Sequence, residues 1–175
     1  VFDQGEHGTC ATFATTAALD AKMNAGDFIS QQCTLELGVD IEKNYFNENK
    51  VNKEDDQADP YLSGWDGYNG NDVVLSRLKK YGVVSNQLCP HAYGDEQLAM
   101  TPDEYSVYSK STWTNDINWK PVTLSDKSSD PNGTKAINNI KNILRSGHRI
   151  VCGILLDTNN ADGDAAPPPR LRRTN

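Results

Sequence analysis

The stretch DQGEHGTCATFA, residues 3–14, joins a glycine-containing turn to a cysteine and an alanine-rich run. Gly5 and Gly8 permit a tight turn, since glycine adopts backbone conformations that other residues avoid. The small, helix-favouring residues that follow predict a helix over residues 10–25, which Gly26 would end. Few charges interrupt this run, so we expect the helix to be buried.

Cys10 stands at the start of this predicted helix, where it could act as a nucleophile. The thiolate is the reactive form of cysteine, and the unpaired N–H groups and dipole of a helix N-terminus favour it. Gln4 can return across the glycine turn, so its side-chain amide and the Cys10 backbone N–H could form an oxyanion hole for acyl transfer. A lone cysteine in an alanine-rich segment is also typical of a small core residue. The residues alone leave both interpretations open.

Composition excludes several classes of function. The chain has 175 residues, of which 37% are hydrophobic and 23% charged, as expected for a globular domain with a core. Its net charge of −7 disfavours binding to nucleic-acid phosphates, which requires a basic face. No apolar run approaches the roughly 20 residues that a membrane helix needs. We therefore expect no nucleic-acid partner and no membrane span.

The chain holds four cysteines, and none of them has the spacing of a metal-binding motif. We therefore predict no metal, and no other cofactor is indicated. Cys152 lies within the apolar run 150–156 and is interpreted as a small buried residue. Cys33 and Cys89 could form a disulfide, which the sequence leaves open.

Beyond the first helix, the pattern predicts further helices and then strands with a helix between them, an order typical of α+β proteins. The predicted elements are a helix capped by Ser30, a polar loop over 47–60, a glycine-rich loop over 64–70, a helix from Asn71 or Asp72 to Gly82, loops at Pro90 and Pro102, a strand within 113–124, a helix capped by Thr134 and ended by Gly147, and a strand over 149–156.

The opening segment resembles the active-site segment of the papain-like cysteine peptidases, usually Gln-Gly-x-Cys-Gly-Ser-Cys-Trp-Ala-Phe. The matching positions are Gln4, Gly5, Gly8, Cys10 and Phe13. Later blocks resemble the family in the same order. These blocks are ISQQ at 29–32, the glycine-rich stretch at 64–70, which resembles the cleft-lining segment, the stretch at 81–93, and the helix, glycine and strand pattern at 140–156, which resembles the opening of the second lobe.

The resemblance implies an α+β, papain-like fold of two lobes. A helical N-terminal lobe that carries the nucleophile is expected over residues 1–110, complete or nearly so. The start of the β-rich second lobe is expected over 111–158, so that this lobe is only partly present. An irregular, proline-rich basic tail is expected over 159–175.

The resemblance also implies thiol-dependent hydrolysis of peptide bonds, through an acyl-enzyme on Cys10 with Gln4 as the oxyanion-hole donor. Gly67 and Gly70 would lie on the wall of the substrate cleft. The implied partners are a peptide or protein substrate and, as a further possibility, a propeptide or inhibitor. A secreted or lysosome- or vacuole-like compartment is favoured over the cytoplasm. Substrate preference and the choice between endo- and exopeptidase action stay open.

The chain departs from the family at several places. His7 stands where most relatives have a cysteine, and Ala11 replaces the usual tryptophan. Cys33 and Cys89 flank a region where the family has a disulfide, although neither matches its usual positions. Nothing after Leu156 resembles the segments that carry the family's general-base histidine and orienting asparagine. We therefore expect the chain to stop, or to pass into unrelated sequence, before them.

The chain's own histidines are interpreted as surface or packing residues rather than as the base. They are His7, His91 and His148. The general base is therefore expected outside this chain, which could be inactive by itself. The alternatives are a non-catalytic papain-like fold, either a pseudopeptidase or an inactive fragment, and an aminopeptidase of the bleomycin-hydrolase type. The interpretation of the chain as an unrelated binding module would leave all of the matching blocks unexplained.

Overall fold

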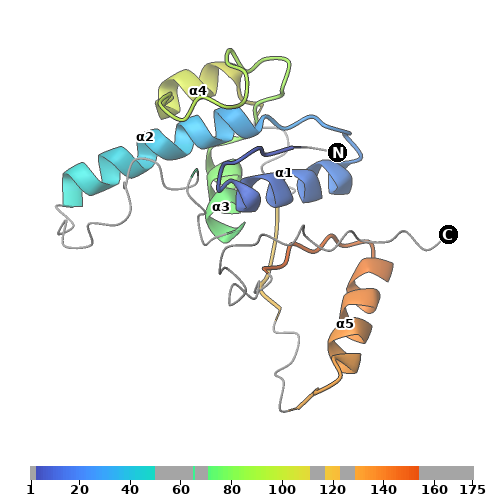
Figure 1. Cartoon of the computed structure of the whole chain (residues 1–175). Helices are drawn as coiled ribbons and strands as arrows, with labels where there is room; N and C mark the ends of the chain where they lie inside the picture. Colours follow the sequence, from blue (N-terminus) through green and yellow to red (C-terminus); the bar gives the residue numbers. More distant parts are fainter. Residues whose placement is uncertain (1–2, 50–64, 66–70, 111–116, 123–128, 154–175) are drawn as a thin grey trace.

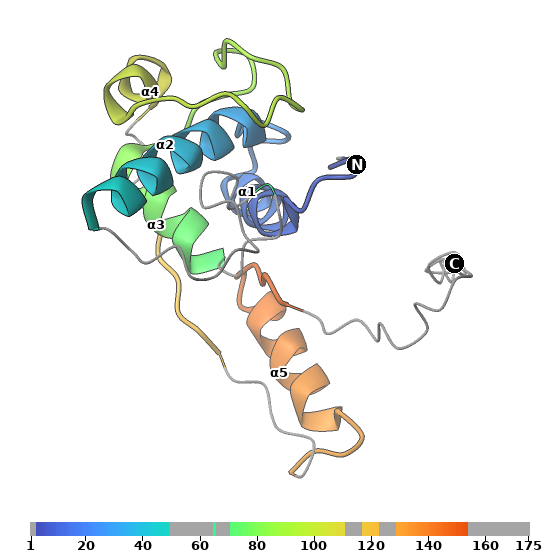
Figure 2. The same cartoon turned by 60° about the vertical axis from the view of Figure 1, so that its left-hand side comes forward.

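The computed structural model describes residues 3–49, 65, 71–110, 117–122 and 129–153, and this part of the chain contains five α-helices. The helices are α1 (Cys10–Met23), α2 (Gln31–Asn49), α3 (Asn71–Tyr81), α4 (Pro102–Tyr108) and α5 (Thr134–Arg145). The first four pack on one another, whereas α5 packs against none of them and stands apart in both views (Figures 1 and 2). No described helix is long and apolar enough to cross a membrane.

Helix α1 begins at Cys10 as predicted but ends earlier than expected. Asn24 adopts a left-handed conformation with φ 53° and donates its N–H to the Asp20 carbonyl, so the helix stops before Gly26. The helix was expected to be buried, and it is buried on one face only, since Cys10 and Ala14 are exposed. The helix packs against α2 and α3, and the face that it buries is polar. This face consists of Thr12, Thr15, Thr16 and Asp20.

Helix α2 is the central element of the body, and it contacts α1, α3 and α4. Ser30 precedes it as predicted, and its Oγ accepts a hydrogen bond from the Cys33 N–H at 3.2 Å. Every residue from Gln31 to Asp40 is buried. The helix continues to Asn49, beyond the predicted start of the polar loop, and the remainder of that loop lies outside the described residues.

Helix α3 begins and ends where the sequence predicts, at Asn71 and just before Gly82. Gly82 has φ 89°, and a Cβ there would approach the Lys110 carbonyl oxygen to 3.0 Å, so both conformation and space require glycine. Helix α4 was missed, because Pro102 was interpreted only as a loop marker. It begins with a capping box in which the side chains of Thr101 and Glu104 each bond the backbone of the other.

The core lies between α1, α2, α3 and α4. Tyr105 of α4 is fully buried, and its hydroxyl donates to the Gly82 carbonyl at 3.1 Å, which ties α4 to the end of α3. Ile117 is also buried, so the segment 117–122 starts against this body. The buried apolar side chains are Ile29, Cys33, Leu35, Leu37, Val39, Trp65, Val74, Leu78, Val83, Val84, Met100, Tyr105 and Ile117.

The predicted strands are not formed in the parts that can be followed. A strand requires ladder hydrogen bonds to a neighbouring strand. Residues 117–122 and 149–153 form no such ladder and are irregular. Antiparallel bridges instead join Ile29 to Ser85 and Val83 to Lys110 inside the helical body. The rest of the two predicted strands, and the tail over 159–175, lie outside the described residues.

Helix α5 also differs from the prediction at its start. Thr134 is the first helical residue rather than the cap, and Gly133 holds the N-cap position with φ 67°. The cap comes from further upstream, because the Asp130 Oδ2 accepts the Ala136 N–H at 2.9 Å. Gly147, with φ 81°, follows the end of the helix as predicted.

Candidate active site

Cys10 is the first residue of α1, and its thiol is free and exposed. Thr9 occupies the N-cap position, yet its side chain makes no capping hydrogen bond to the first turn. Thr9 is fully buried, so its hydroxyl is directed elsewhere. The first turn of α1 is therefore not closed by its N-cap side chain, and its backbone N–H groups can serve a bound group beside the sulfur.

Gln4 lies directly beside Cys10. Its Nε2 donates to the Cys10 Sγ at 3.0 Å and to the His7 carbonyl at 2.8 Å, which uses both hydrogens of the amide. The turn that Gly5 permits, with φ 62°, brings the two residues together. An amide donor this close to the sulfur could donate to the oxyanion of a tetrahedral adduct formed on it.

His7 is close to Cys10 in the chain, but its side chain contacts Glu96, Trp65 and Tyr93. Its Nδ1 lies within hydrogen-bond distance of the Glu96 carboxylate. Its ring meets Trp65 and Tyr93 edge to face, with centroids at 5.1 Å and 5.8 Å. These contacts hold His7 as a packing residue of the loop that carries Gln4.

The other two histidines are engaged away from the thiol. The Nδ1 of His91 lies 3.0 Å from the buried carboxylate of Glu36 on α2. His148 is exposed after α5, and its backbone N–H donates to the Ile143 carbonyl at 3.3 Å. All three histidines fall within the described residues, and among these residues no hydrogen bond or ion pair joins a histidine to the Cys10 sulfur.

Tyr93 is a site residue that the sequence analysis missed. Its hydroxyl donates to the Gln4 carbonyl at 3.1 Å and lies 2.6 Å from the Thr9 Oγ1. Burial raises the pKa of the Tyr93 phenol, and the nearby Glu96 carboxylate adds to this, although the Thr9 hydrogen bond opposes it. The hydroxyl therefore stays protonated at neutral pH. These contacts span 84 and 89 positions of sequence, so no local pattern signals them.

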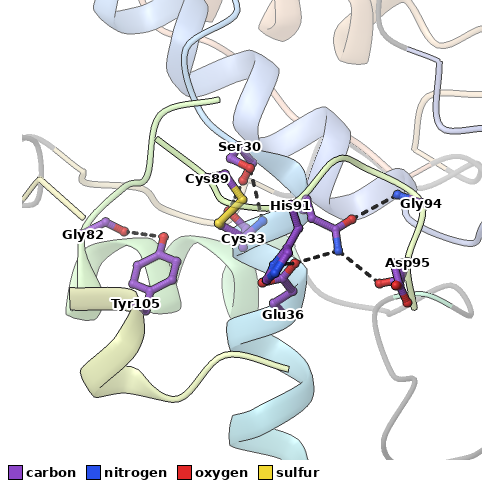
Figure 3. Close-up of a disulfide and its surroundings, with 11 residues drawn as sticks. Ser30, Cys33, Glu36, Gly82, Cys89, His91, Gly94, Asp95 and Tyr105 are labelled. Atoms are coloured by element: carbon purple, nitrogen blue, oxygen red, sulfur yellow. Dashed lines mark hydrogen bonds and ion pairs between the residues drawn. A yellow bond between two sulfur atoms is a disulfide. The ribbon is translucent and has the colours of Figure 1, made fainter. Parts of the chain in front are cut away.

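The loop that carries Tyr93 starts at a disulfide. Cys33 of α2 and Cys89 are joined with a Cα–Cα distance of 5.9 Å, so the structure brings together the two cysteines for which a bridge was left open (Figure 3). The bridge encloses a sequence separation of 56 residues. It fixes the beginning of the loop on the central helix.

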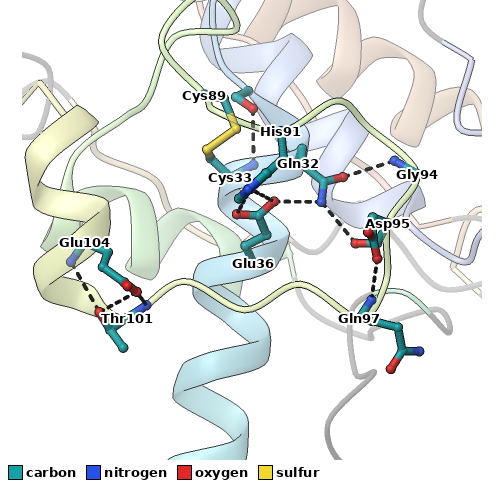
Figure 4. A network of polar contacts seen from close by, with 11 residues as sticks. Gln32, Cys33, Glu36, Cys89, His91, Gly94, Asp95, Gln97, Thr101 and Glu104 are labelled. Carbon is teal, nitrogen blue, oxygen red and sulfur yellow. Dashed lines mark hydrogen bonds and ion pairs between the residues drawn. A yellow bond between two sulfur atoms is a disulfide. The ribbon is translucent and has the colours of Figure 1, made fainter.

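Gln32, the neighbour of Cys33, holds the same loop further along. Its amide nitrogen donates to the Asp95 carbonyl at 3.1 Å and to Glu36 at 2.8 Å. Its amide oxygen accepts the Gly94 N–H at 3.1 Å. Figure 4 shows this network beside the disulfide, between α2 and the loop. The segment 89–97 is thus attached to α2 on both sides of Tyr93, by the disulfide at Cys89 and by the hydrogen bond of Gly94.

The structure does not describe the two predicted substrate-binding residues. Gly67 and Gly70 lie outside the described residues. Trp65, from the same glycine-rich stretch, is buried and stacks on Tyr93, and its carbonyl accepts the Gly8 N–H. The start of this stretch therefore lies against the loop that carries Gln4.

Cys152 differs from its prediction, since its thiol is free and exposed rather than buried. The apolar run around it forms no strand in the part that is described, so nothing encloses the side chain there. In the same part of the chain, no group of three or more histidine, cysteine, aspartate or glutamate side chains is arranged to hold a metal ion.

The site thus consists of an exposed thiol at a helix N-terminus, a side-chain amide that donates to it, and a tyrosine and threonine behind the amide. This arrangement can support nucleophilic attack on a carbonyl carbon and can donate to the oxyanion that results. Comparison of the chain with models of known protein families and with curated proteins finds no match.

Proposed function

We propose that this chain carries the nucleophile and oxyanion donor of a papain-like cysteine peptidase. The observation that supports the proposal most strongly is the contact of 3.0 Å between the Gln4 Nε2 and the exposed Cys10 Sγ at the start of α1. A cysteine that served only as core would be enclosed by apolar side chains, whereas this sulfur is open on one side. The substrate class is a peptide or protein.

In the proposed reaction, the Cys10 sulfur attacks the carbonyl carbon of a peptide bond. The oxygen of the tetrahedral adduct accepts hydrogen bonds from the Gln4 amide and the Cys10 backbone N–H. The C–N bond then breaks, the amine leaves with a proton, and the acyl group stays on the sulfur as a thioester. Water hydrolyses this thioester and restores the thiol.

A general base has to take the thiol proton and return it to the leaving amine. His7 and His91 are paired with Glu96 and Glu36, and neither they nor His148 bonds to the Cys10 sulfur. We therefore assign the base to a residue other than these three. The proposed papain-like, two-lobe α+β fold agrees with this assignment, since that family carries its base on the second lobe.

One second candidate is a papain-like fold that binds peptides without hydrolysing them, and it is favoured because no hydrogen bond joins a histidine to the Cys10 sulfur among the described residues. The two candidates differ at the thiol. A peptidase site accepts an acyl group on Cys10, and a binding module does not.

Reaction with the p-nitrophenyl ester of an N-acylated amino acid tests the proposal. Such an ester has a good leaving group, so acylation of Cys10 depends on the nucleophile and oxyanion donor more than on general-acid catalysis. We expect a burst of p-nitrophenol equal to one acyl group for each chain. Gln4→Ala should lower the burst rate about 100-fold, the usual cost of removing one oxyanion-hole donor.

The matched controls are a second glutamine and a second free cysteine. Gln87→Ala and Cys152→Ser should leave the burst unchanged, while Cys10→Ser should abolish it. A burst of the same size and rate in Cys10→Ser would overturn the proposal. A folded wild-type chain that binds peptides but gives no burst would support the binding module instead.

A further inference from the structure

The hydroxyl of Tyr93 lies between two residues that flank the nucleophile site. A phenol has one hydrogen, and here that hydrogen is donated to the Gln4 carbonyl at 3.1 Å. The Thr9 Oγ1, at 2.6 Å from the Tyr93 oxygen, must therefore be the donor of the second bond. The hydrogen bonds run in one direction, from Thr9 to Tyr93 to Gln4.

Each member of this series is fixed by independent contacts. Thr9 is fully buried and immediately precedes Cys10, so its hydroxyl moves with the start of α1. The Tyr93 ring stacks on Trp65 with a centroid distance of 5.5 Å and meets Phe13 edge to face at 5.0 Å. The ring is therefore held by packing, and the hydroxyl adds only the hydrogen bonds.

The loop around Tyr93 is tied to the rest of the body before and after the tyrosine. Cys89 is bonded to Cys33 of α2, and Gly94 donates to Gln32 of the same helix. Glu96 then pairs with His7, whose carbonyl accepts from the Gln4 amide. Both the backbone and the side chain of Gln4 are thus held through segment 89–97.

We propose that Tyr93 is a positioning residue for the oxyanion donor, which sets the Gln4 amide beside the Cys10 sulfur by holding the Gln4 backbone. This inference rests on the proposed function of Cys10 and Gln4. The described hydrogen bonds of the Tyr93 hydroxyl go to Gln4 and Thr9 and not to the Cys10 sulfur, so we expect its effect on catalysis to pass through Gln4. The Thr9 hydroxyl contributes to the same positioning because it holds the phenol from the other side.

Two substitutions remove the hydrogen bonds while they keep the shape of the side chains. Tyr93→Phe, which removes both hydrogen bonds of the phenol, should lower the rate of the p-nitrophenol burst about tenfold, and Thr9→Val, which removes only the bond between Thr9 and Tyr93, should lower it less. The change should appear in kcat rather than in KM, because the oxyanion donor acts in the transition state. The double variant should lose little more than Tyr93→Phe alone, since Tyr93→Phe already breaks both bonds of the series.

Two conservative variants separate positioning from general stability. Thr9→Ser keeps the hydroxyl and should restore the wild-type burst rate, even though it removes a buried methyl group. Tyr108→Phe, on α4, makes the same chemical change away from the site and should leave the rate unchanged. A folded Tyr93→Phe variant with the wild-type rate, or an equal loss in Tyr108→Phe, would overturn the inference.

A second measurement does not depend on catalysis. In the ¹⁵N-labelled chain, nuclear Overhauser contacts between the Gln4 side-chain amide and the Cys10 β protons report their proximity. We expect these contacts to weaken in Tyr93→Phe and to persist in Tyr108→Phe. If they persist in Tyr93→Phe, the inference is wrong, whatever the ester assay shows. If the wild-type chain gives no burst but the contacts are lost in Tyr93→Phe, the positioning stands and the proposed peptidase function fails.

Discussion

Helices α1 and α5 differ both in the apolar pattern of their sequences and in how they pack. The α5 sequence has a regular apolar stripe, yet none of its residues is buried, and Ile137 is 50% and Leu144 46% exposed. The α1 sequence has little such pattern, yet it packs firmly on α2 and α3 through a polar face. A helical period therefore predicts the helix but not whether the helix finds a partner.

The polar face of α1 is held by specific hydrogen bonds. The Thr16 hydroxyl donates to the Thr12 carbonyl at 2.9 Å and accepts from Gln31 of α2 at 3.0 Å. The Asp20 carboxylate accepts the backbone N–H groups of Phe28 and Ile29. Such bonds require one orientation of α1, and this orientation places Cys10 where Gln4 can reach it.

The largest expected effect comes from the disulfide that braces the α1–α4 body. The double variant Cys33→Ala, Cys89→Ala should lose about 4 kcal/mol of unfolding free energy, the chain-entropy estimate for a bridge across a separation of 56 residues. Urea denaturation at equilibrium measures this loss, with Cys152→Ala as the control that should not change. A loss below about 1 kcal/mol would mean that the bridge does not hold the body together.

Two leucines allow the same substitution in both regions. Leu78 on α3 is fully buried, whereas Leu144 on α5 is 46% exposed. Leu78→Ala should cost about 3 kcal/mol of unfolding free energy through lost burial and the resulting cavity. Leu144→Ala should cost less than about 1 kcal/mol. Equal losses by urea denaturation would show that α5 is as firmly packed as the body, and the comparison would fail.

The polar face of α1 has a signature in the pH dependence of stability. Burial raises the pKa of Asp20 from 3.8 to about 6; the hydrogen bonds from Ile29 and Phe28 oppose this, and the charge of Asp27 adds to it. A raised pKa means that the folded state binds the proton more tightly, so the contribution is complete below pH 3.8 and is lost as the pH rises through about 6. The unfolding free energy should therefore fall by about 2–3 kcal/mol over this pH range.

Asp20→Asn keeps an acceptor oxygen for the same backbone N–H groups but cannot ionise. The decline in unfolding free energy between pH 4 and pH 7 should therefore shrink in this variant by about 2–3 kcal/mol relative to wild type. Asp27→Asn changes an exposed carboxylate in the segment between α1 and α2. It serves as the control and should change the profile much less. Parallel profiles for wild type and Asp20→Asn would contradict the assignment.

Local signals in the sequence predicted several boundaries correctly. Ser30 caps α2 and Gly82 ends α3, since both act on neighbouring backbone groups. The start of α4 had an equally local signal in Thr101 and Glu104, which was overlooked. At α5 the local signal misled, because Asp130 caps the helix from outside the usual N-cap position.

The candidate site also contains one contact that a local signal predicts and one that no local signal predicts. The proximity of Gln4 and Cys10 could be predicted, because one short glycine-containing turn separates them. The contact of Tyr93 with Gln4 spans 89 positions, and its existence depends on how the loop folds back onto α2. No pattern within a single sequence encodes such a contact, so only the structure reveals it.

The proposal that Cys10 and Gln4 form an acyl-transfer site can be tested within one molecule, because the chain has two free, exposed cysteines, Cys10 and Cys152. After brief reaction with the activated ester, peptide mass spectrometry measures the acyl group on Cys10 and on Cys152 separately. We expect a hydroxylamine-sensitive thioester to accumulate on Cys10 well before Cys152, and this lead to be largely lost in Gln4→Ala. Equal acylation of the two cysteines in the wild-type chain, or a lead that Gln4→Ala leaves intact, would contradict the proposal.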